Sequence, residues 1–193
     1  NYFCIMKRIA IFASGNGSNA ENICNYFSSS GGVSVVVLYT NKEDSYVIER
    51  MKTLEIPVVV FSKSDMINSL EIDNSLSEKK IDFIVLSGFL LKIPERIILN
   101  YKNKIINLHP SLLPKYGGKG MYGNNVHRSV IENNETESGI SIHFVNANYD
   151  KGDIIFQKIC KLEQNETSES LSKKIHRLEH SFFPKIIEKI ILK

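Results

Sequence analysis

The 193-residue sequence predicts an α/β protein with an open, mostly parallel, Rossmann-like sheet of seven strands and helices on both faces. Short apolar runs rich in β-branched residues alternate with helical patterns, which is typical of βαβ units in a parallel sheet. The first apolar run also leads into a glycine loop, S-G-N-G-S-N at 14–19, before a helical pattern. No repeat or Pro/Ser-rich linker divides the chain, so we expect a single domain spanning 1–193.

Five strands and four helices are predicted in the first part of the chain. The run at 33–39 is mostly apolar and β-branched, as expected of a strand covered on both faces. Pro94 suits the first turn of a helix, where a missing N–H leaves no hydrogen bond unmade. The expected strands are 7–13, 33–39, 57–61, 82–87 and 104–108, and the expected helices are 20–27, 44–54, 67–80 and 94–100.

A helix, two strands and a long helix are predicted in the remainder. After a glycine-rich loop at 117–123, residues 126–132 have a helical pattern, and a short link joins strands at 139–145 and 153–161. Thr167 is a suitable start for the last helix, which Pro184 should kink or break. Its apolar positions recur at helical spacing: Leu171, Ile175, Leu178, Phe182, Ile186 and Ile190.

Composition argues against several classes of partner. The 24 Lys+Arg and 21 Asp+Glu give a net charge of +3, spread along the chain, so we expect no nucleic-acid partner. The longest apolar stretches are shorter than the roughly 20 residues that span a bilayer, so we expect no membrane segment.

The N-terminal residues and the cysteines favour a cytoplasmic protein. Residues 1–5 lack the features of a signal peptide, and Met6 is the expected natural start. Cys4, Cys24 and Cys160 have neither metal-ligand nor CxxC spacing, as expected of reduced structural cysteines.

The glycine loop favours an anionic ligand. Gly15 and Gly17 permit a tight turn, and the following helix start offers unpaired amides with a partial positive charge. Ser18 and Asn19 add side-chain donors. A plain structural turn and a dinucleotide site are the alternatives, but the second strand ends in Y-T-N rather than in the acid that a dinucleotide site uses. We therefore favour a phosphate monoester.

A second polar group ends the fifth strand, within I-I-N-L-H-P-S-L-L-P-K-Y at 105–116. Asn107 and His109 are two positions apart and project to the same side of an extended strand. The carboxyl edge of an open α/β sheet is where ligands bind, and the glycine loop lies on that edge too, so one crevice can hold both. An Asn and a His satisfied by backbone groups are the structural alternative.

Asp150 is a candidate partner for His109. It lies in the polar turn N-A-N-Y-D-K-G-D, where a solvated acid is the default interpretation. A functional Asp150 would lie beside His109, stabilise the imidazolium and raise its pKa, as a proton-transfer catalyst needs. The other histidines, His127, His143, His176 and His180, show no metal-site pattern, and we expect no metal.

Four motifs together resemble the phosphoribosylglycinamide formyltransferases over 6–184. They are S-G-N-G-S-N at 14–19, L-S-G-F at 86–89, I-N-L-H-P-S-L-L-P at 106–114 and H-F-V-N-A-N-Y-D-K-G at 143–152. The resemblance implies that Asn107, His109 and Asp150 are catalytic. It also implies a set of contacts to the nucleotide substrate: Gly17, Ser18, Asn19, His176 and Glu179.

The resemblance further implies a folate pocket and a cis peptide bond between Leu113 and Pro114. The folate-binding positions are Leu90, Leu91, Lys92, Ile93, Asn107, Asn146, Ala147, Asn148, Tyr149 and Asp150. The segment 117–125 is longer than in the shorter members of the family, and it is either a mobile flap or a decorative surface loop.

The expected activity is transfer of a formyl group from 10-formyltetrahydrofolate, a co-substrate, to the amine of glycinamide ribonucleotide in purine synthesis. Residues from about 6 to 100 would form the nucleotide-phosphate half, and those from about 101 to 193 the folate and catalytic half. The alternatives are another folate-dependent formyltransferase, a formyltetrahydrofolate hydrolase, or a non-catalytic nucleotide-binding module. Either a monomer or a homodimer is compatible with the sequence.

Overall fold

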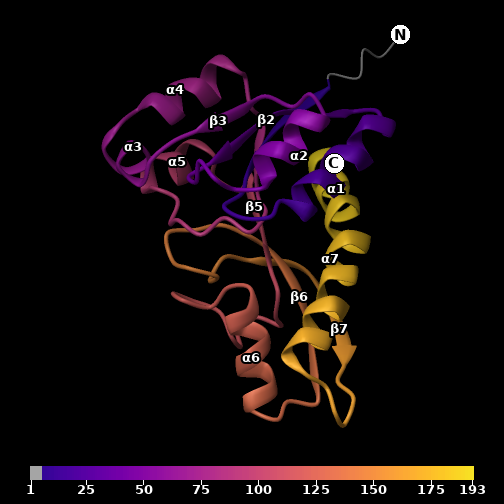
Figure 1. Ribbon diagram of the computed structural model, residues 1–193. Helices are drawn as coiled ribbons and strands as arrows, with labels where there is room; N and C mark the ends of the chain where they lie inside the picture. Colours follow the sequence, from indigo (N-terminus) through magenta and orange to yellow (C-terminus); the bar gives the residue numbers. More distant parts are fainter. Residues whose placement is uncertain (1–5) are drawn as a thin grey trace.

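The computed structural model describes residues 6–193 of the chain. Cys4 and the question of a leader segment at 1–5 lie outside the described residues. Figure 1 shows a central sheet with helices on both sides, and the long C-terminal helix along one side.

The sheet has seven strands in the order β3-β2-β1-β4-β5-β6-β7. Strands β1 to β5 pair in parallel, and β6 and β7 add to the edge as antiparallel strands. Every predicted strand is present, and no strand end shifts by more than two residues. Their bounds are β1 Lys7–Phe12, β2 Val33–Thr40, β3 Val58–Val60, β4 Phe83–Leu86, β5 Ile105–His109, β6 Glu137–Phe144 and β7 Ile154–Lys161.

Two hydrophobic cores cover the two faces of the sheet. Alternating residues of β1 divide between them, with Ile9 and Ile11 on one face and Ala10 and Phe12 on the other. The first core lies under α1 (Ser18–Ser29), α2 (Val47–Thr53), α6 (Asn124–Glu132) and α7 (Ser168–Ile191), and the second under α3 (Lys63–Asn68), α4 (Glu71–Glu78) and α5 (Glu95–Asn100). A doubly covered sheet explains why the strand runs are apolar throughout.

The prediction of one helix over 67–80 is wrong. Two short helices, α3 and α4, occupy this region. The first begins earlier than expected because Ser62 and Asp65 form a capping box, in which each side chain hydrogen bonds the other residue's backbone. It ends at Asn68, and the hydroxyl of the next residue, Ser69, accepts a hydrogen bond from the N–H of Glu71 and so supports the start of the second helix.

Pro184 does not break the last helix, so that alternative is wrong. The helix continues from Ser168 to Ile191, with Phe183, Pro184 and Ile187 buried against the sheet. Packing of this apolar stripe outweighs the one hydrogen bond that a proline removes. Among residues 6–193, no helix combines the length and apolar character needed to cross a membrane.

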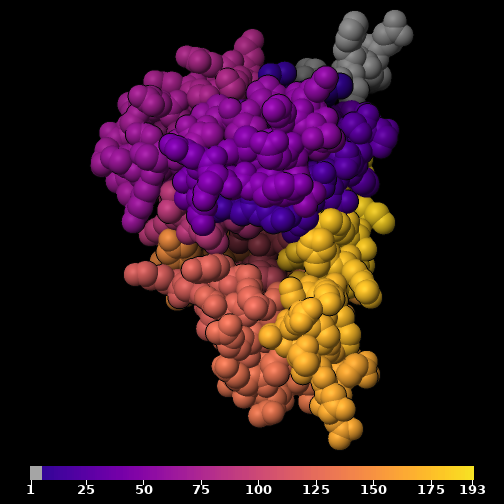
Figure 2. Space-filling model, in the orientation of Figure 1, coloured from indigo at the N-terminus to yellow at the C-terminus, as the bar shows by residue number. Residues whose placement is uncertain are grey.

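The carboxyl ends of the parallel strands meet at one edge of the sheet. In the space-filling view, the surface is hollowed at this edge, between the N-terminal half and the segments that carry α6 and α7 (Figure 2). The hollow is a cavity of about 710 Å³.

Candidate active site

The glycine loop forms one end of the cavity. Gly17 has a φ of +77°, and a Cβ added there would lie 2.2 Å from Val47 Cγ2, so both the backbone and the space require glycine. Arg50 of α2 holds the loop by donating from Nε to the Asn16 carbonyl and from Nη2 to Asn16 Oδ1, each at 2.9 Å. The amides at the start of α1 therefore face the cavity with a fixed geometry, suited to an anion.

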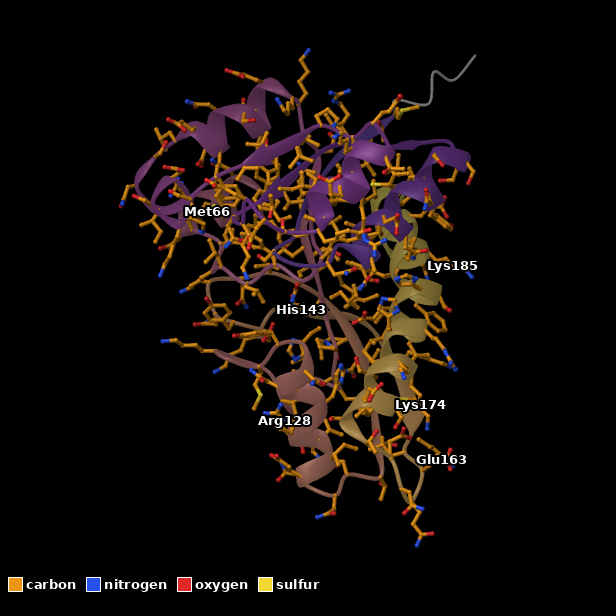
Figure 3. All side chains as sticks on the ribbon, in the orientation of Figure 1. Met66, Arg128, His143, Glu163, Lys174 and Lys185 are labelled. Carbon is orange, nitrogen blue, oxygen red and sulfur yellow. The ribbon has the colours of Figure 1, made fainter. Side chains whose placement is uncertain are left out.

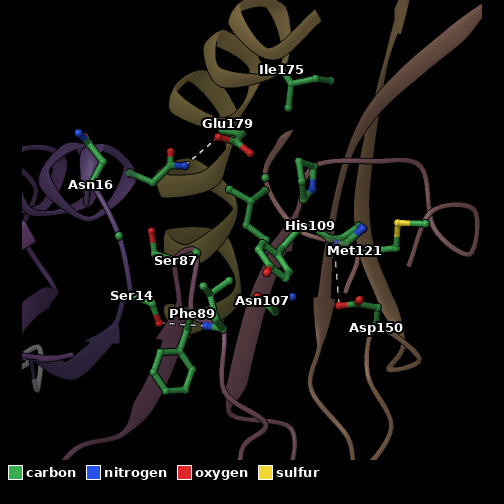
Figure 4. Close-up of a pocket in the computed structure, with 18 of the residues that line it drawn as sticks. Ser14, Asn16, Ser87, Phe89, Asn107, His109, Met121, Asp150, Ile175 and Glu179 are labelled. Carbon is green, nitrogen blue, oxygen red and sulfur yellow. Dashed lines mark hydrogen bonds and ion pairs between the residues drawn. The ribbon is translucent and has the colours of Figure 1, made fainter. Parts of the chain in front are cut away.

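Helix α7 closes this end through two hydrogen bonds. Ser18 Oγ lies 2.8 Å from His176 Nε2. Asn19 Nδ2 donates to Glu179 Oε2 at 2.8 Å, the dashed line at Glu179 in Figure 4. All the predicted nucleotide-contacting residues, Gly17, Ser18, Asn19, His176 and Glu179, thus line one end of one cavity. The carboxyl group of Glu179 is buried although the residue is partly exposed, and this burial raises its pKa to about 7.

His109 and Asp150 meet at the opposite end. His109 is only 4% exposed, and its Nδ1 lies 3.7 Å from Asp150 Oδ1. Its Nε2 lies 2.7 Å from the carbonyl oxygen of Tyr116, to which it can only donate. A carbonyl at one nitrogen and a carboxylate at the other favour the doubly protonated ring.

Burial opposes that charge. The pKa of His109 lies below its ordinary value because burial lowers it more than Asp150 and the Tyr116 carbonyl raise it. The expected contact with Asp150 is therefore present, and the acid raises the pKa as expected, but it does not bring the pKa above the ordinary value.

Asp150 is not a free turn acid, because donors surround its carboxylate. Its Oδ2 accepts from the N–H of Gly118 at 2.8 Å, and its Oδ1 lies 3.6 Å from His143 Nε2. Burial alone would raise the pKa of Asp150, but the nearby imidazole of His143, the charge of His109 and the Gly118 N–H together lower it. Its backbone is left-handed, with a φ of +53°.

His143 is a site residue for which no role was predicted. It pairs with Asn107 across β5 and β6 and lies near the middle of the molecule in Figure 3. Its Nδ1–H donates to the Phe144 carbonyl at 2.8 Å, which leaves Nε2 as an acceptor for Asn107 Nδ2 at 3.0 Å. This contact orients the Asn107 amide and leaves its second N–H available. The sequence did not predict this pairing because the antiparallel register of β6 on β5 cannot be read from the sequence.

The predicted folate-binding residues separate into two groups. Leu90, Asn107, Tyr149 and Asp150 line the cavity. The others do not line it: Leu91, Lys92, Ile93, Asn146, Ala147 and Asn148. Ile93 is 3% exposed and, with Leu91, packs in the core under α3, α4 and α5. The side chain of Asn146 stabilises its turn by hydrogen bonds to the backbone of Asn148 and Lys151.

The loop at 117–123 borders the cavity. Its lining residues are Gly118, Lys119, Gly120, Met121, Tyr122 and Gly123, followed by His127 of α6. Leu113–Pro114 is a cis peptide bond, as the resemblance implied. At the other wall, Ser14 Oγ donates to Asn41 Oδ1 at 2.6 Å and accepts from the N–H of Leu90 at 3.0 Å, which joins the ends of three strands.

No metal-binding group of three or more histidine, cysteine, aspartate or glutamate side chains occurs within residues 6–193. The arrangement combines an anion-binding helix start with an Asn, a His and an Asp, and such a set can stabilise an oxyanion and move a proton.

Comparison with known proteins shows which family has this fold and these residues. The family model described as formyl transferase matches residues 7–187. The chain is 32% identical to the phosphoribosylglycinamide formyltransferase of Bacillus subtilis over 96% of its own length and 95% of the relative's. It is 39% identical to the chloroplastic phosphoribosylglycinamide formyltransferase of Arabidopsis thaliana, and it spans about 64% of that protein and 60% of its Vigna unguiculata counterpart.

Solved structures agree. The crystal structure of phosphoribosylglycinamide formyltransferase from Bacillus halodurans aligns with a TM-score of 0.87 at 35% identity, covering 97% of this chain and 96% of that one. The family model, the relatives and the fold point to one conclusion: the chain belongs to the formyl transferase family, on its phosphoribosylglycinamide formyltransferase branch.

Proposed function

We propose that this protein transfers a formyl group from 10-formyltetrahydrofolate to the amine of glycinamide ribonucleotide, giving N-formylglycinamide ribonucleotide and tetrahydrofolate. The observation that carries the proposal is the single cavity that joins a phosphate-type glycine loop to Asn107, His109 and Asp150. The names of the relatives support the same reaction.

The glycine-loop end suits the phosphate of the nucleotide. The amides at Gly17, Ser18 and Asn19 offer donors to the phosphate, and His176 adds a ring nitrogen beside Ser18. Glu179, with its raised pKa, adds little negative charge below neutral pH and so repels the phosphate less than an ordinary carboxylate would. The ribose and glycinamide arm would extend from here toward His109.

The chemistry takes place at the other end. The substrate amine attacks the formyl carbon, and a C–N bond forms as the carbonyl oxygen becomes an oxyanion. Protonated His109 and the free N–H of Asn107 stabilise that oxyanion. A proton then passes from the attacking nitrogen to the folate N10, assisted by His109 and held in place by Asp150, and the bond from carbon to N10 breaks. No covalent enzyme intermediate is required.

The folate would enter beside Leu90 and Tyr149, which line the cavity together with Asp150. The glycine loop of the half from about 6 to 100 would thus hold the nucleotide phosphate, with His176 and Glu179 of α7 beside it, and the half from about 101 to 193 would supply the reacting groups. Leu90 lies at the boundary, tied to the glycine-loop side through Ser14.

A competition assay tests this function. Purified protein and 10-formyltetrahydrofolate are offered glycinamide ribonucleotide, methionyl-tRNA and water as acceptors, and formylated product and released tetrahydrofolate are measured. We expect turnover with glycinamide ribonucleotide far above the other two. Equal release of tetrahydrofolate without any acceptor would favour a hydrolase, and binding without turnover would favour a nucleotide-binding module.

We further infer a cytoplasmic location and a monomer or homodimer. The free thiols Cys24 and Cys160 suit a reducing compartment, although two plant relatives are named as chloroplastic. Cell fractionation tests the first inference, and light scattering of the purified protein tests the second.

A further inference from the structure

The backbone at 116–118 contacts both members of the pair formed by His109 and Asp150. His109 Nε2 donates to the carbonyl oxygen of Tyr116 at 2.7 Å. Two residues later, the N–H of Gly118 donates to Asp150 Oδ2 at 2.8 Å. One short stretch of backbone therefore holds the imidazole and the carboxylate that face each other at 3.7 Å. Whatever fixes this stretch also fixes the geometry of the pair.

Tyr116 has an unusual backbone conformation for so large a residue. Its φ of +56° lies in the left-handed region, which is strained for bulky side chains. Such a conformation persists only where surrounding contacts impose it. The Tyr116 ring packs against the core under α1, α2, α6 and α7, and its hydroxyl donates to Glu135 Oε1 at 2.9 Å. The packing and this hydrogen bond together hold the Tyr116 carbonyl toward His109.

Glu135 is itself held in place at the end of α6. Its N–H donates to the carbonyl of Val130 at 3.3 Å, and Val130 is buried in the same core. Lys115 Nζ donates to Glu135 Oε1 at 2.9 Å and to Oε2 at 3.2 Å. The hydrogen bonds from Lys115 and Tyr116 hold the pKa of Glu135 below its ordinary value, so the carboxylate is ionised at neutral pH. A charged acceptor makes the stronger hydrogen bond to the phenol.

Glu135 lies behind the reacting groups rather than beside the substrates. Neither Tyr116 nor Glu135 lines the cavity that contains His109, and both line a second cavity of about 250 Å³. An effect of Glu135 on His109 would therefore pass through Tyr116 and not through a bound ligand.

The Tyr116 carbonyl decides which nitrogen of His109 titrates. A carbonyl can only accept, so Nε2 keeps its proton in both charge states of the ring. The proton that is gained or lost is then the one on Nδ1, which faces Asp150. Without the carbonyl, Asp150 would draw the single proton of the neutral ring to Nδ1 instead. The other ionisable groups that act on His109 are His143 of β6 and His127 of α6, which are present in either case.

We propose that Glu135 is a positioning residue: through the Tyr116 hydroxyl it holds the backbone that fixes the His109 ring and its Asp150 partner. The proposal rests on the proposed function where turnover is concerned, because formyl transfer is the reaction measured. The protonation state of the His109 ring can be measured without any substrate.

Four variants isolate this path. Glu135→Ala removes the acceptor, Glu135→Gln keeps an acceptor oxygen, and Tyr116→Phe removes the hydroxyl but keeps the ring. Lys115→Met is the matched control, because it removes the other hydrogen-bond partner of Glu135 and leaves the phenol in place; the Lys115 side chain is 68% exposed, and such exposed ion pairs contribute little. Steady-state kinetics across pH give kcat and KM, NMR of the imidazole nitrogens gives the pKa and the tautomer of His109, and thermal unfolding gives stability.

We expect Glu135→Ala and Tyr116→Phe each to lower kcat roughly 10-fold, less than the roughly 10²–10⁴-fold contribution of a general acid–base group itself. KM for glycinamide ribonucleotide should stay near the wild-type value, because no substrate contact is removed. Since the Tyr116 carbonyl raises the pKa of His109, that pKa should fall, and activity on the alkaline side should be lost at lower pH. The neutral ring should shift toward the form protonated on Nδ1.

The remaining variants test whether the effect passes through one hydrogen bond. The double variant of Glu135→Ala and Tyr116→Phe should lose no more activity than either single variant, because both break the same contact. Glu135→Gln should retain most of kcat, and Lys115→Met should match the wild type in kcat and in the pKa of His109.

Several outcomes would overturn the proposal. An unchanged pKa and tautomer of His109 in folded Glu135→Ala would remove the link, and Tyr116→Phe decides the matter if Glu135→Ala does not fold. Equal losses in Lys115→Met and Glu135→Ala, or a lower melting temperature with unchanged kcat, would make Glu135 a structural residue. Wild-type protein that forms no product from glycinamide ribonucleotide, while the variants shift the His109 ring as expected, would instead overturn the proposed function and leave the positioning of His109 supported.

Discussion

The two ends of the cavity each bury a carboxylate, and the two carboxylates have opposite pKa shifts. Asp150 is surrounded by the Gly118 N–H, His109 and His143, and its pKa lies below the ordinary value. Glu179 has a single neutral partner, the amide of Asn19, and its pKa rises to about 7. Burial acts in the same direction on both, so the number and charge of the donors decide the outcome.

This difference matches the chemistry proposed for each end. A permanent negative charge beside His109 favours the imidazolium that would stabilise an oxyanion. A carboxyl group that is readily neutralised beside the glycine loop reduces repulsion toward a bound phosphate. The two ends are thus distinguished by charge as well as by position, and each of the following changes tests one end.

The largest expected effect comes from His109→Ala at the chemical end. Turnover should fall by roughly 10²–10⁴-fold, the usual contribution of a general acid–base group, because proton transfer and oxyanion stabilisation are both lost. Nucleotide binding at the other end should be nearly intact. Single-turnover kinetics and calorimetry check both statements, and turnover within a few-fold of wild type would rule out a catalytic His109.

Glu179→Gln tests the phosphate end through stability. The folded-state pKa of about 7 lies above the ordinary value, so the folded protein retains a proton that the unfolded chain releases, and stability falls as pH rises from about 4.5 to 7. The variant should lose this dependence and gain on the order of 3 kcal/mol at pH 8, at about 1.4 kcal/mol per pKa unit. Denaturant unfolding between pH 5 and 8 measures it. Parallel curves for the two proteins would show that Glu179 ionises normally.

Gly17→Ala tests the backbone of the same end. We expect a loss of about 1–2 kcal/mol from the left-handed backbone alone, with more from the contact between the new Cβ and Val47. Gly15→Ala is the control, because a Cβ at Gly15 meets nothing within 4 Å. Chemical denaturation of both variants decides it, and equal stabilities would mean that the loop adjusts without strain.

Asp150→Asn is the smallest change and the most specific to the chemical end. Asp150 raises the pKa of His109, so its removal should lower that pKa further and reduce the protonated fraction at neutral pH. We expect activity to fall on the order of 10-fold, with the loss on the alkaline side beginning at lower pH than in wild type. NMR titration of the imidazole measures the pKa shift directly. An unchanged His109 pKa in a folded variant would show that Asp150 does not set the charge of His109.

The sequence predicted the strands and the strand-end residues well because both depend on local patterns. Apolar runs fix the strands, and the loop after a parallel strand must reach the carboxyl edge, which brings Ser18 and His109 to one cavity. The contact between His109 and Asp150 came from family resemblance alone, because the path of the intervening helix α6 and strand β6 sets the distance.

The features that the sequence did not predict depend on packing between distant segments. The role of His143 follows from its pairing with Asn107, which only the register of β6 on β5 reveals. Similarly, the unbroken helix around Pro184 results from burial against the sheet rather than from local propensity. Ile93 packs in the core with Ile84 and Ile97, and local periodicity does not encode these contacts.

The left-handed backbone at Asp150 limits which residues can replace it. A φ of +53° is readily adopted by Asp, Asn and Gly but is strained for β-branched and bulky side chains. In a library randomised at this position, selection for folding alone should therefore retain Asp, Asn and Gly, and a second selection for activity should retain Asp. The spectrum of survivors in each step would separate the requirement of the turn from the requirement of the charge.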